Sequence, residues 1–174
     1  MSRATKLIIM SDMHRGDVTG ADDFAKNSLI YRCILECHLA NGFTYIELGD
    51  AKELWENDNF DQIYITHTPV YELLTKFHDP DPEKTRYLKV WGNHDLYWKD
   101  NEPVYQSLFP GIQIYDGIIL NNTILMIHGH QADPKCTGEP VSANSLSTFS
   151  GQASSDWARK TKPGLPQIPA SVMR

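Results

Sequence analysis

The chain has 174 residues, of which 41% are hydrophobic and 22% are charged, and its formal net charge is −6. This composition is ordinary for one globular domain with a core of its own, and its negative charge gives no reason to expect a nucleic-acid partner. No apolar run approaches the roughly 20 residues that cross a bilayer, and the N-terminus lacks the features of a signal peptide. We therefore expect a cytoplasmic protein without a transmembrane segment.

Strands and helices are predicted to alternate along the first part of the chain. Four short apolar runs have the length and composition of strands, at residues 7–10, 45–48, 87–91 and 124–127. Asp22 and Asp23 can cap a helix that runs to about Asn41, with Gly42 as its terminator. Cys33 and Cys37 lie one turn apart in this helix, and the odd number of three cysteines argues against a disulfide framework. We expect reduced, buried thiols.

The middle of the chain is less clear. Residues 63–66 have strand propensity, whereas the apolar residues of 70–77 have helical spacing around Pro69. We favour a helix over 61–77, because a second crossover between parallel strands is needed. A short helix is predicted over 102–109, and Asn121-Asn122 can form the turn of a hairpin between 112–120 and 123–127. Together these elements predict an α/β layered domain.

The composition changes after His130. Residues 131–174 hold five of the ten prolines of the chain. They also hold ten serines and threonines, but only nine large apolar residues and cysteines taken together. Such a segment does not bury enough apolar surface to offset its chain entropy. We expect one domain over 1–133 and a poorly ordered tail over 134–174.

Polar residues follow each of the four predicted strands. The clusters are Asp12-Met13-His14, Gly49-Asp50, Gly92-Asn93-His94-Asp95 and His128-Gly129-His130. Asp12 and His14 share one side if the strand extends through them, and the Asp50 carboxylate can bridge two ions about 3.5 to 4 Å apart. Four neighbouring strand ends can therefore build one metal site.

The remaining ligands indicate the kind of ion. An amide oxygen from Asn93 and an imidazole nitrogen from His128 suit a borderline divalent ion such as Mn, Fe, Zn or Ni. His94 would then face the substrate, where an imidazole can protonate a leaving oxygen.

The four clusters, in this order and spacing, resemble those of the calcineurin-like metallophosphoesterases over about residues 5–133. The resemblance implies a metallophosphoesterase-type αββα layered β-sandwich and a dinuclear centre whose bridging water attacks phosphorus. Its implied ligands are Asp12 and His14 for the first ion, Asp50 as the bridge, and Asn93 and His128 for the second. It also implies that His94 is the proton donor or transition-state stabiliser. Glu53 resembles the acidic residue with which some members orient this histidine.

Residues 49–55 and 128–131 are similar to bacterial members near the UDP-2,3-diacylglucosamine hydrolases. One family motif is missing. The family pattern ends in Gly-His-x-His, with one histidine for each ion, whereas no histidine follows His130 here. His130 is either a substitute ligand or, as we favour, a loop residue, and Asp133 is another candidate replacement. We therefore expect a truncated or atypical C-terminal part and weak, substoichiometric occupancy by the two divalent ions.

Two functions stay open from the sequence. The first is hydrolysis of a phosphoester or pyrophosphate bond in a small phosphorylated substrate by a metal-activated water. The second is a truncated metallophosphoesterase-like module with weak activity or none. The missing histidine pair is the feature that separates them.

Several other residues are expected outside the metal site. The histidines at positions 38, 67 and 78 have the surroundings of surface or packing residues, and Trp91 ends a buried strand. Trp98 with Tyr97 is the better candidate for the edge of a pocket. Arg15 is either a phosphate contact or a solvated loop residue, and the sequence does not favour one over the other.

Overall fold

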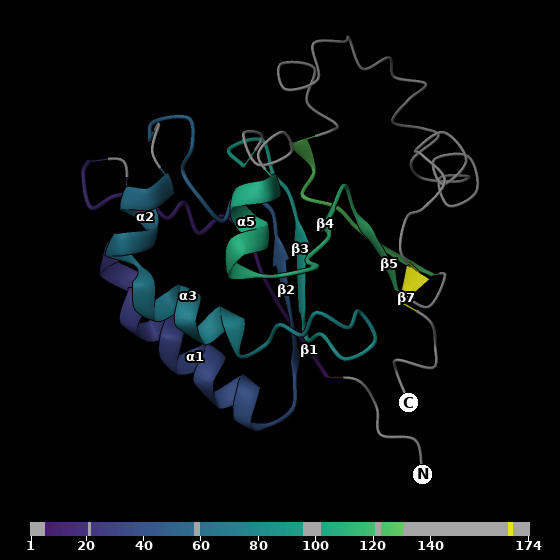
Figure 1. Ribbon diagram of the computed structural model, residues 1–174. Coiled ribbons are helices and arrows are strands. Elements are labelled where there is room, and N and C mark those ends of the chain that lie inside the picture. The colour runs from purple at the N-terminus through teal and green to yellow at the C-terminus, as the bar shows by residue number, and fades with distance from the viewer. Residues whose placement is uncertain are drawn as a thin grey trace, which may run out of the picture.

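Three of the predicted strands lie side by side as parallel strands in one sheet. The computed structural model describes residues 6–20, 22–57, 60–95, 102–120, 123–130 and 167–168. Within these residues a parallel sheet has the order β1 (Leu7–Met10), β2 (Thr44–Leu48), β3 (Tyr87–Val90) and β4 (Ile114–Tyr115) (Figure 1). Parallel pairing places the carboxyl ends of β1, β2 and β3 at one edge of the sheet, where the polar clusters begin.

The helices cover one face of this sheet (Figure 1). They are the short 3-10 helix η1 (Ala25–Asn27) and the α-helices α1 (Ser28–Ala40), α2 (Phe60–Thr66), α3 (Thr68–Thr75) and α5 (Glu102–Leu108). Asp22 caps the first turn, since its Oδ1 accepts hydrogen bonds from the N–H groups of Phe24 and Ala25 at 3.1 and 2.9 Å. Gly42 ends α1 with a φ of 73°.

The ambiguous segment over 61–77 is helical, so the prediction of a helix is confirmed. It forms two helices that break at His67, and Pro69 lies in the first turn of α3. A proline is tolerated there because the first N–H groups of a helix have no intrahelical acceptor. The expected helix over 102–109 is also present as α5.

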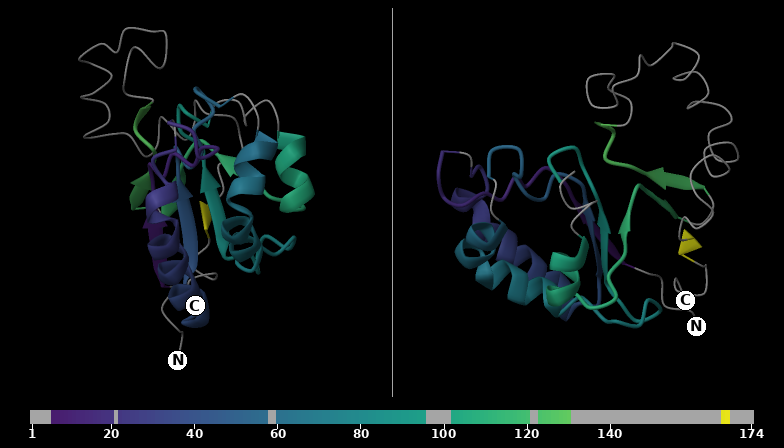
Figure 2. Two further views of the ribbon diagram at one scale, coloured as in Figure 1. Left: turned by 90° about the vertical axis from the view of Figure 1, so that its left-hand side faces the viewer. Right: turned by 45° about the horizontal axis from the view of Figure 1, so that its top comes forward.

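A second, smaller sheet has the order β6 (Ile124–Met126), β5 (Ile118–Leu120) and β7 (Gln167–Ile168). The antiparallel pairing of β5 with β6 confirms the predicted hairpin over 118–120 and 124–126, and β7 pairs with β5 in parallel. The rest of the predicted strand over 112–120 does not join this hairpin, because Ile114–Tyr115 pairs with β3 as β4. The expectation that the strand at 124–127 is a neighbour of the other three was wrong, because β6 lies in this second sheet. The views in Figure 2 place this sheet on the side of the parallel sheet away from the helices. Apart from β7, the expected tail over 134–174 lies outside the described residues, as do Tyr97, Trp98 and Asp133.

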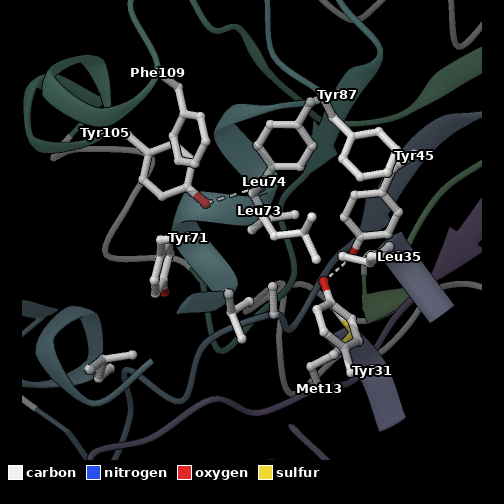
Figure 3. Close-up of a cluster of buried hydrophobic side chains, with 14 of the residues drawn as sticks. Met13, Tyr31, Leu35, Tyr45, Tyr71, Leu73, Leu74, Tyr87, Tyr105 and Phe109 are labelled. Atoms are coloured by element: carbon white, nitrogen blue, oxygen red, sulfur yellow. Dashed lines mark hydrogen bonds between the residues drawn. The ribbon is translucent and has the colours of Figure 1, made fainter. Parts of the chain in front are cut away.

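Two hydrophobic clusters hold these layers together. The larger one lies between the helices and the parallel sheet and is rich in tyrosine and leucine (Figure 3). The smaller one joins Ile46 and Val90 of the parallel sheet to Ile118 and Met126 of the second sheet. The chain is therefore a mixed α/β protein with a four-stranded parallel sheet, as the sequence predicted at this level.

Burial differs from the predictions at a few positions. Cys33 and Cys37 are unbridged, as expected, but both are exposed, because they lie on the face of α1 opposite the buried Tyr31 and Leu35. The prediction of buried thiols was wrong for these two. Trp91 is buried, as expected. In the described part of the chain, no helix has both the length and the apolar character that crossing a membrane requires.

Candidate metal centre

The loops after β1 and β2 have a strained backbone at three candidate ligands. Asp12, His14 and Asp50 have φ values of 56°, 46° and 48°, a left-handed conformation that costs an L-residue about 1–2 kcal/mol. Such strain persists only where surrounding structure imposes it, and it gathers at functional sites. Here the Asp12 N–H donates to the Gly49 carbonyl at 3.2 Å and the His14 N–H to the Asp50 carbonyl at 3.0 Å. The condition under which Asp12 and His14 would share one side of a strand is not met, because β1 ends at Met10.

Two glycines are required by close approaches in the same region. A Cβ on Gly49 would lie 2.5 Å from Nδ1 of His128, and Gly49 has a φ of 78°. A Cβ on Gly92 would overlap the Asp50 carboxylate. Each glycine of the Gly-Asp and Gly-Asn-His-Asp clusters therefore makes room for a candidate ligand from another loop.

Asp50 lies at the centre of the cluster and is almost fully buried. Its Oδ1 accepts the His94 backbone N–H at 2.9 Å, and its Oδ2 lies 3.1 Å from Nε2 of His128. Burial opposes ionisation, but the bonds from His128 and the His94 N–H hold the pKa of Asp50 below its usual value. The same bond to Asp50 raises the pKa of His128, whose Nδ1 lies 3.1 Å from the Leu48 carbonyl oxygen.

Potential ligand atoms form two overlapping groups around Asp50. One group is His14, Asp50 and His94, and the other is Asp12, Asp50 and His128; within each group the ligand atoms lie within 4.8 Å of one another. The shared residue is the one predicted to bridge two ions. The structure groups Asp12 with His128, whereas the resemblance implies that Asp12 and His14 share an ion. Carboxylates with imidazoles are a donor set that fits borderline divalent ions.

Asn93 follows Gly92 in the loop after β3 and is partly buried. It therefore lies in the same loop as His94, one residue from a member of the first group. Its place in the chain is compatible with the predicted ligand role.

Glu53 contacts two histidines, where the sequence predicted one. Its Oε2 lies 2.7 Å from Nδ1 of His14 and its Oε1 lies 2.7 Å from Nδ1 of His94. Since a carboxylate only accepts, each Nδ1 acts as the donor, and Nε2 of each ring is left for other partners. The Trp55 indole stacks on the His94 ring at a centroid distance of 4.0 Å. Glu53 thus fixes both rings.

Five fully buried charged side chains lie beneath these loops. They are Arg15, Glu47, Lys52, Lys89 and Asp95, which we call the buried charge cluster. Glu47 lies 2.7 Å from Arg15 and 2.8 Å from Lys89, and Asp95 lies 3.5 Å from Lys89 and 3.8 Å from Lys52. Burial raises the pKa of Glu47, but its basic partners hold it well below the ordinary value.

The sequence patterns did not predict the buried charge cluster. Both expectations for Arg15 were wrong, because its side chain points into the core and its guanidinium lies 5.5 Å from the centre of the Tyr71 ring. The available signal was a single charged residue within each of two apolar strands, Glu47 in β2 and Lys89 in β3.

The remaining histidines lie outside both groups of ligand atoms. His130 is buried against Trp91 with ring centroids 4.5 Å apart, and its ring centroid lies 5.5 Å from that of His128. His67 pairs with Asp22 at 2.8 Å, and His78 bonds the Pro110 carbonyl at 2.7 Å. His38 bonds the Ile34 carbonyl at 2.6 Å within α1. The last three make packing and capping contacts, as expected.

An open cavity of about 570 Å³ adjoins the cluster at Asp12. Its lining is mixed, with apolar side chains such as Met13 and Phe24 beside the charged Asp12, Asp23 and Lys26. Its size is in the range of small-molecule sites.

Searches with the whole chain found no matching family model, no matching curated protein and no matching solved structure.

Proposed function

We propose that the protein is a divalent-metal-dependent hydrolase of phosphoester or pyrophosphate bonds. In this proposal the fold is a metallophosphoesterase-type αββα sandwich with an atypical C-terminal part. One observation carries the proposal: the buried Asp50 carboxylate has potential ligand atoms of His14 in one group, and of Asp12 and His128 in the other, within 4.8 Å. A carboxylate shared in this way suits two ions that act on one water and one phosphoryl group.

The proposed ligands are Asp12, His14, Asp50, Asn93 and His128. When bound, two divalent ions such as Mn, Fe, Zn or Ni supply a water of lowered pKa and polarise the phosphoryl oxygen. Asp50 would be shared by the two ions, and Glu53 keeps the His14 ring in place through Nδ1. The cavity beside Asp12 has room for the organic part of a small phosphorylated substrate.

His94 is the proposed proton donor to the leaving oxygen. Its Nδ1 is engaged by Glu53 at 2.7 Å and one face of its ring is covered by Trp55. The ring is therefore held in one orientation, with Nε2 as the atom that exchanges a proton.

The experiment that tests this function is hydrolysis of a generic aryl phosphodiester by protein reconstituted with Mn²⁺ or Ni²⁺. We expect turnover that a chelator abolishes and that Asp50→Ala removes. Glu72→Ala, which removes an exposed carboxylate on α3, is the matched control and leaves turnover unchanged. Turnover that persists without metal would refute the proposal. Metal binding without turnover would favour the inactive module.

A further inference from the structure

Asp95 ends the Gly-Asn-His-Asp cluster and has no part in the proposed chemistry, although it is fully buried. Its carboxylate accepts hydrogen bonds from three backbone N–H groups, those of Ala51 and Lys52 at 3.2 Å each and that of Gly92 at 3.3 Å. Ala51 and Lys52 directly follow Asp50, and Gly92 directly precedes Asn93. One side chain therefore joins the loop after β2 to the loop after β3.

The carboxylate of Asp95 is not itself available to an ion. Both of its oxygens accept backbone N–H groups, and Lys89 and Lys52 lie 3.5 and 3.8 Å away on the buried side. Asp95 therefore acts on the metal centre through the backbone of its neighbours.

The buried charge cluster extends this connection to the third loop. Lys89 bonds Glu47 at 2.8 Å, Glu47 bonds Arg15 at 2.7 Å, and Arg15 directly follows His14. The Arg15 backbone also bonds the loop after β2, donating to Ala51 at 3.1 Å and accepting from Glu53 at 3.0 Å. Buried ion pairs are weak contributors to net stability, but the loss of one partner leaves the other charge buried and uncompensated.

The two loops tolerate little relative displacement. The His94 N–H reaches Oδ1 of Asp50 at 2.9 Å, and a Cβ on Gly92 would overlap the same carboxylate. A shift of one loop against the other would therefore break the bond from His94 to Asp50 or bring the Gly92 backbone into collision with the Asp50 carboxylate.

We propose that Asp95 is a positioning residue that holds Asp50 and His94 in register by binding the backbone of both loops. The effect of Asp95 on activity rests on the proposed function, because the relative position of Asp50 and His94 matters to activity only if Asp50 binds metal. Partners of metal ligands typically change metal affinity or activity by about 10- to 100-fold when they are mutated.

The test compares Asp95→Asn with Glu47→Gln. An asparagine keeps the shape of Asp95 but replaces one acceptor oxygen with an NH₂ donor, so at least one loop N–H loses its partner. Glu47→Gln makes the same chemical change within the same cluster, but Glu47 bonds side chains only, at Arg15, Tyr45, Tyr87 and Lys89. It therefore controls for the loss of one charge from the buried charge cluster, its link to Arg15 included, while the three N–H bonds to Asp95 stay in place.

Two measurements are made on both variants. Amide hydrogen exchange in metal-free protein reports local opening of the loops. Relative to the native protein, we expect Asp95→Asn to raise the exchange rates of the Ala51, Lys52 and Gly92 amides more than those of the β2 and β3 amides. In Glu47→Gln we expect the exchange rates of loops and strands to rise together. Mn²⁺ titration of the folded protein is expected to show an affinity about 10- to 100-fold lower for Asp95→Asn than for the control.

The outcomes separate the positioning role of Asp95 from the proposed function. Loop exchange or Mn²⁺ affinity in Asp95→Asn equal to that of the control would overturn the positioning role while leaving the proposed function in place. If the native protein binds no Mn²⁺, the proposed function fails, and the exchange pattern alone supports or overturns the register role. If Asp95→Asn does not fold, the double variant Asp95→Asn with Lys89→Met is used instead. It removes one acidic and one basic charge together, so that the substitution at Asp95 does not leave the Lys89 charge uncompensated.

Discussion

The substitution Gly49→Ala places a methyl group against a candidate metal ligand. At a φ of 78° the alanine is strained by about 1–2 kcal/mol. Its Cβ would lie 2.5 Å from Nδ1 and 2.7 Å from Cβ of His128, whereas non-bonded carbon atoms prefer about 3.5–4.0 Å. The imidazole must therefore move by about 1 Å, at a cost typical of overpacking, about 1–3 kcal/mol. A displacement of this size in a catalytic group can lower turnover by about 10²-fold.

Gly42→Ala is the matched control for this prediction. Gly42 has a nearly equal φ of 73°, and a Cβ there would meet nothing within 4 Å. Urea unfolding of both variants isolates the contact with His128, since the backbone strain is common to both. We expect Gly49→Ala to be less stable than Gly42→Ala by about 1–3 kcal/mol and to bind Mn²⁺ more weakly. Equal free energies of unfolding and equal Mn²⁺ affinities would show that His128 does not occupy this position.

Three further predictions concern other parts of the site. His94→Ala is expected to lower turnover by about 10²- to 10⁴-fold with nearly unchanged metal content; an equal loss of bound metal would make His94 a ligand instead. Because the folded pKa of Glu47 is depressed, its contribution to stability is present above its ordinary value of 4.5 and is lost as the pH falls below it. Urea unfolding of Glu47→Gln should show a smaller loss of unfolding free energy below this pH than the native protein shows. An equal loss in both proteins would contradict the depressed pKa of Glu47. Metal analysis after mild dialysis should find less than two ions per chain, whereas two tightly held ions would show that His130 or another residue replaces the missing histidines.

The order of elements could be predicted from the sequence because it depends on local patterns. Apolar runs of strand length, a capped helix ended by Gly42 and a turn between two short strands each carry their signal within a few residues. The convergence of Asp12, His14 and Asp50 could be predicted from the topology of parallel strands, without any detail of the loops. His128 follows β6 of the second sheet, so its approach to Asp50 depends on how the two sheets pack and not on that topology.

The finer contacts could not be predicted because they depend on how the loops fold back. Arg15 follows His14 in a loop, a setting in which a charged side chain usually meets water. The left-handed conformations of Asp12 and His14 turn the chain so that Arg15 enters the core instead. The second histidine contact of Glu53 and the bonds from the Ala51 and Lys52 N–H groups to Asp95 likewise arise between segments about 40 residues apart.

The buried charge cluster also limits how this sequence can change. Three basic and two acidic side chains are buried together, so an apolar replacement of Glu47 leaves Arg15 charged and without its carboxylate partner. Replacement of two members of opposite sign avoids that penalty. The acceptable substitutions at Glu47, Lys89 and Asp95 are therefore interdependent, and mutational libraries that vary one position at a time would score each of them as intolerant while missing combinations that fold.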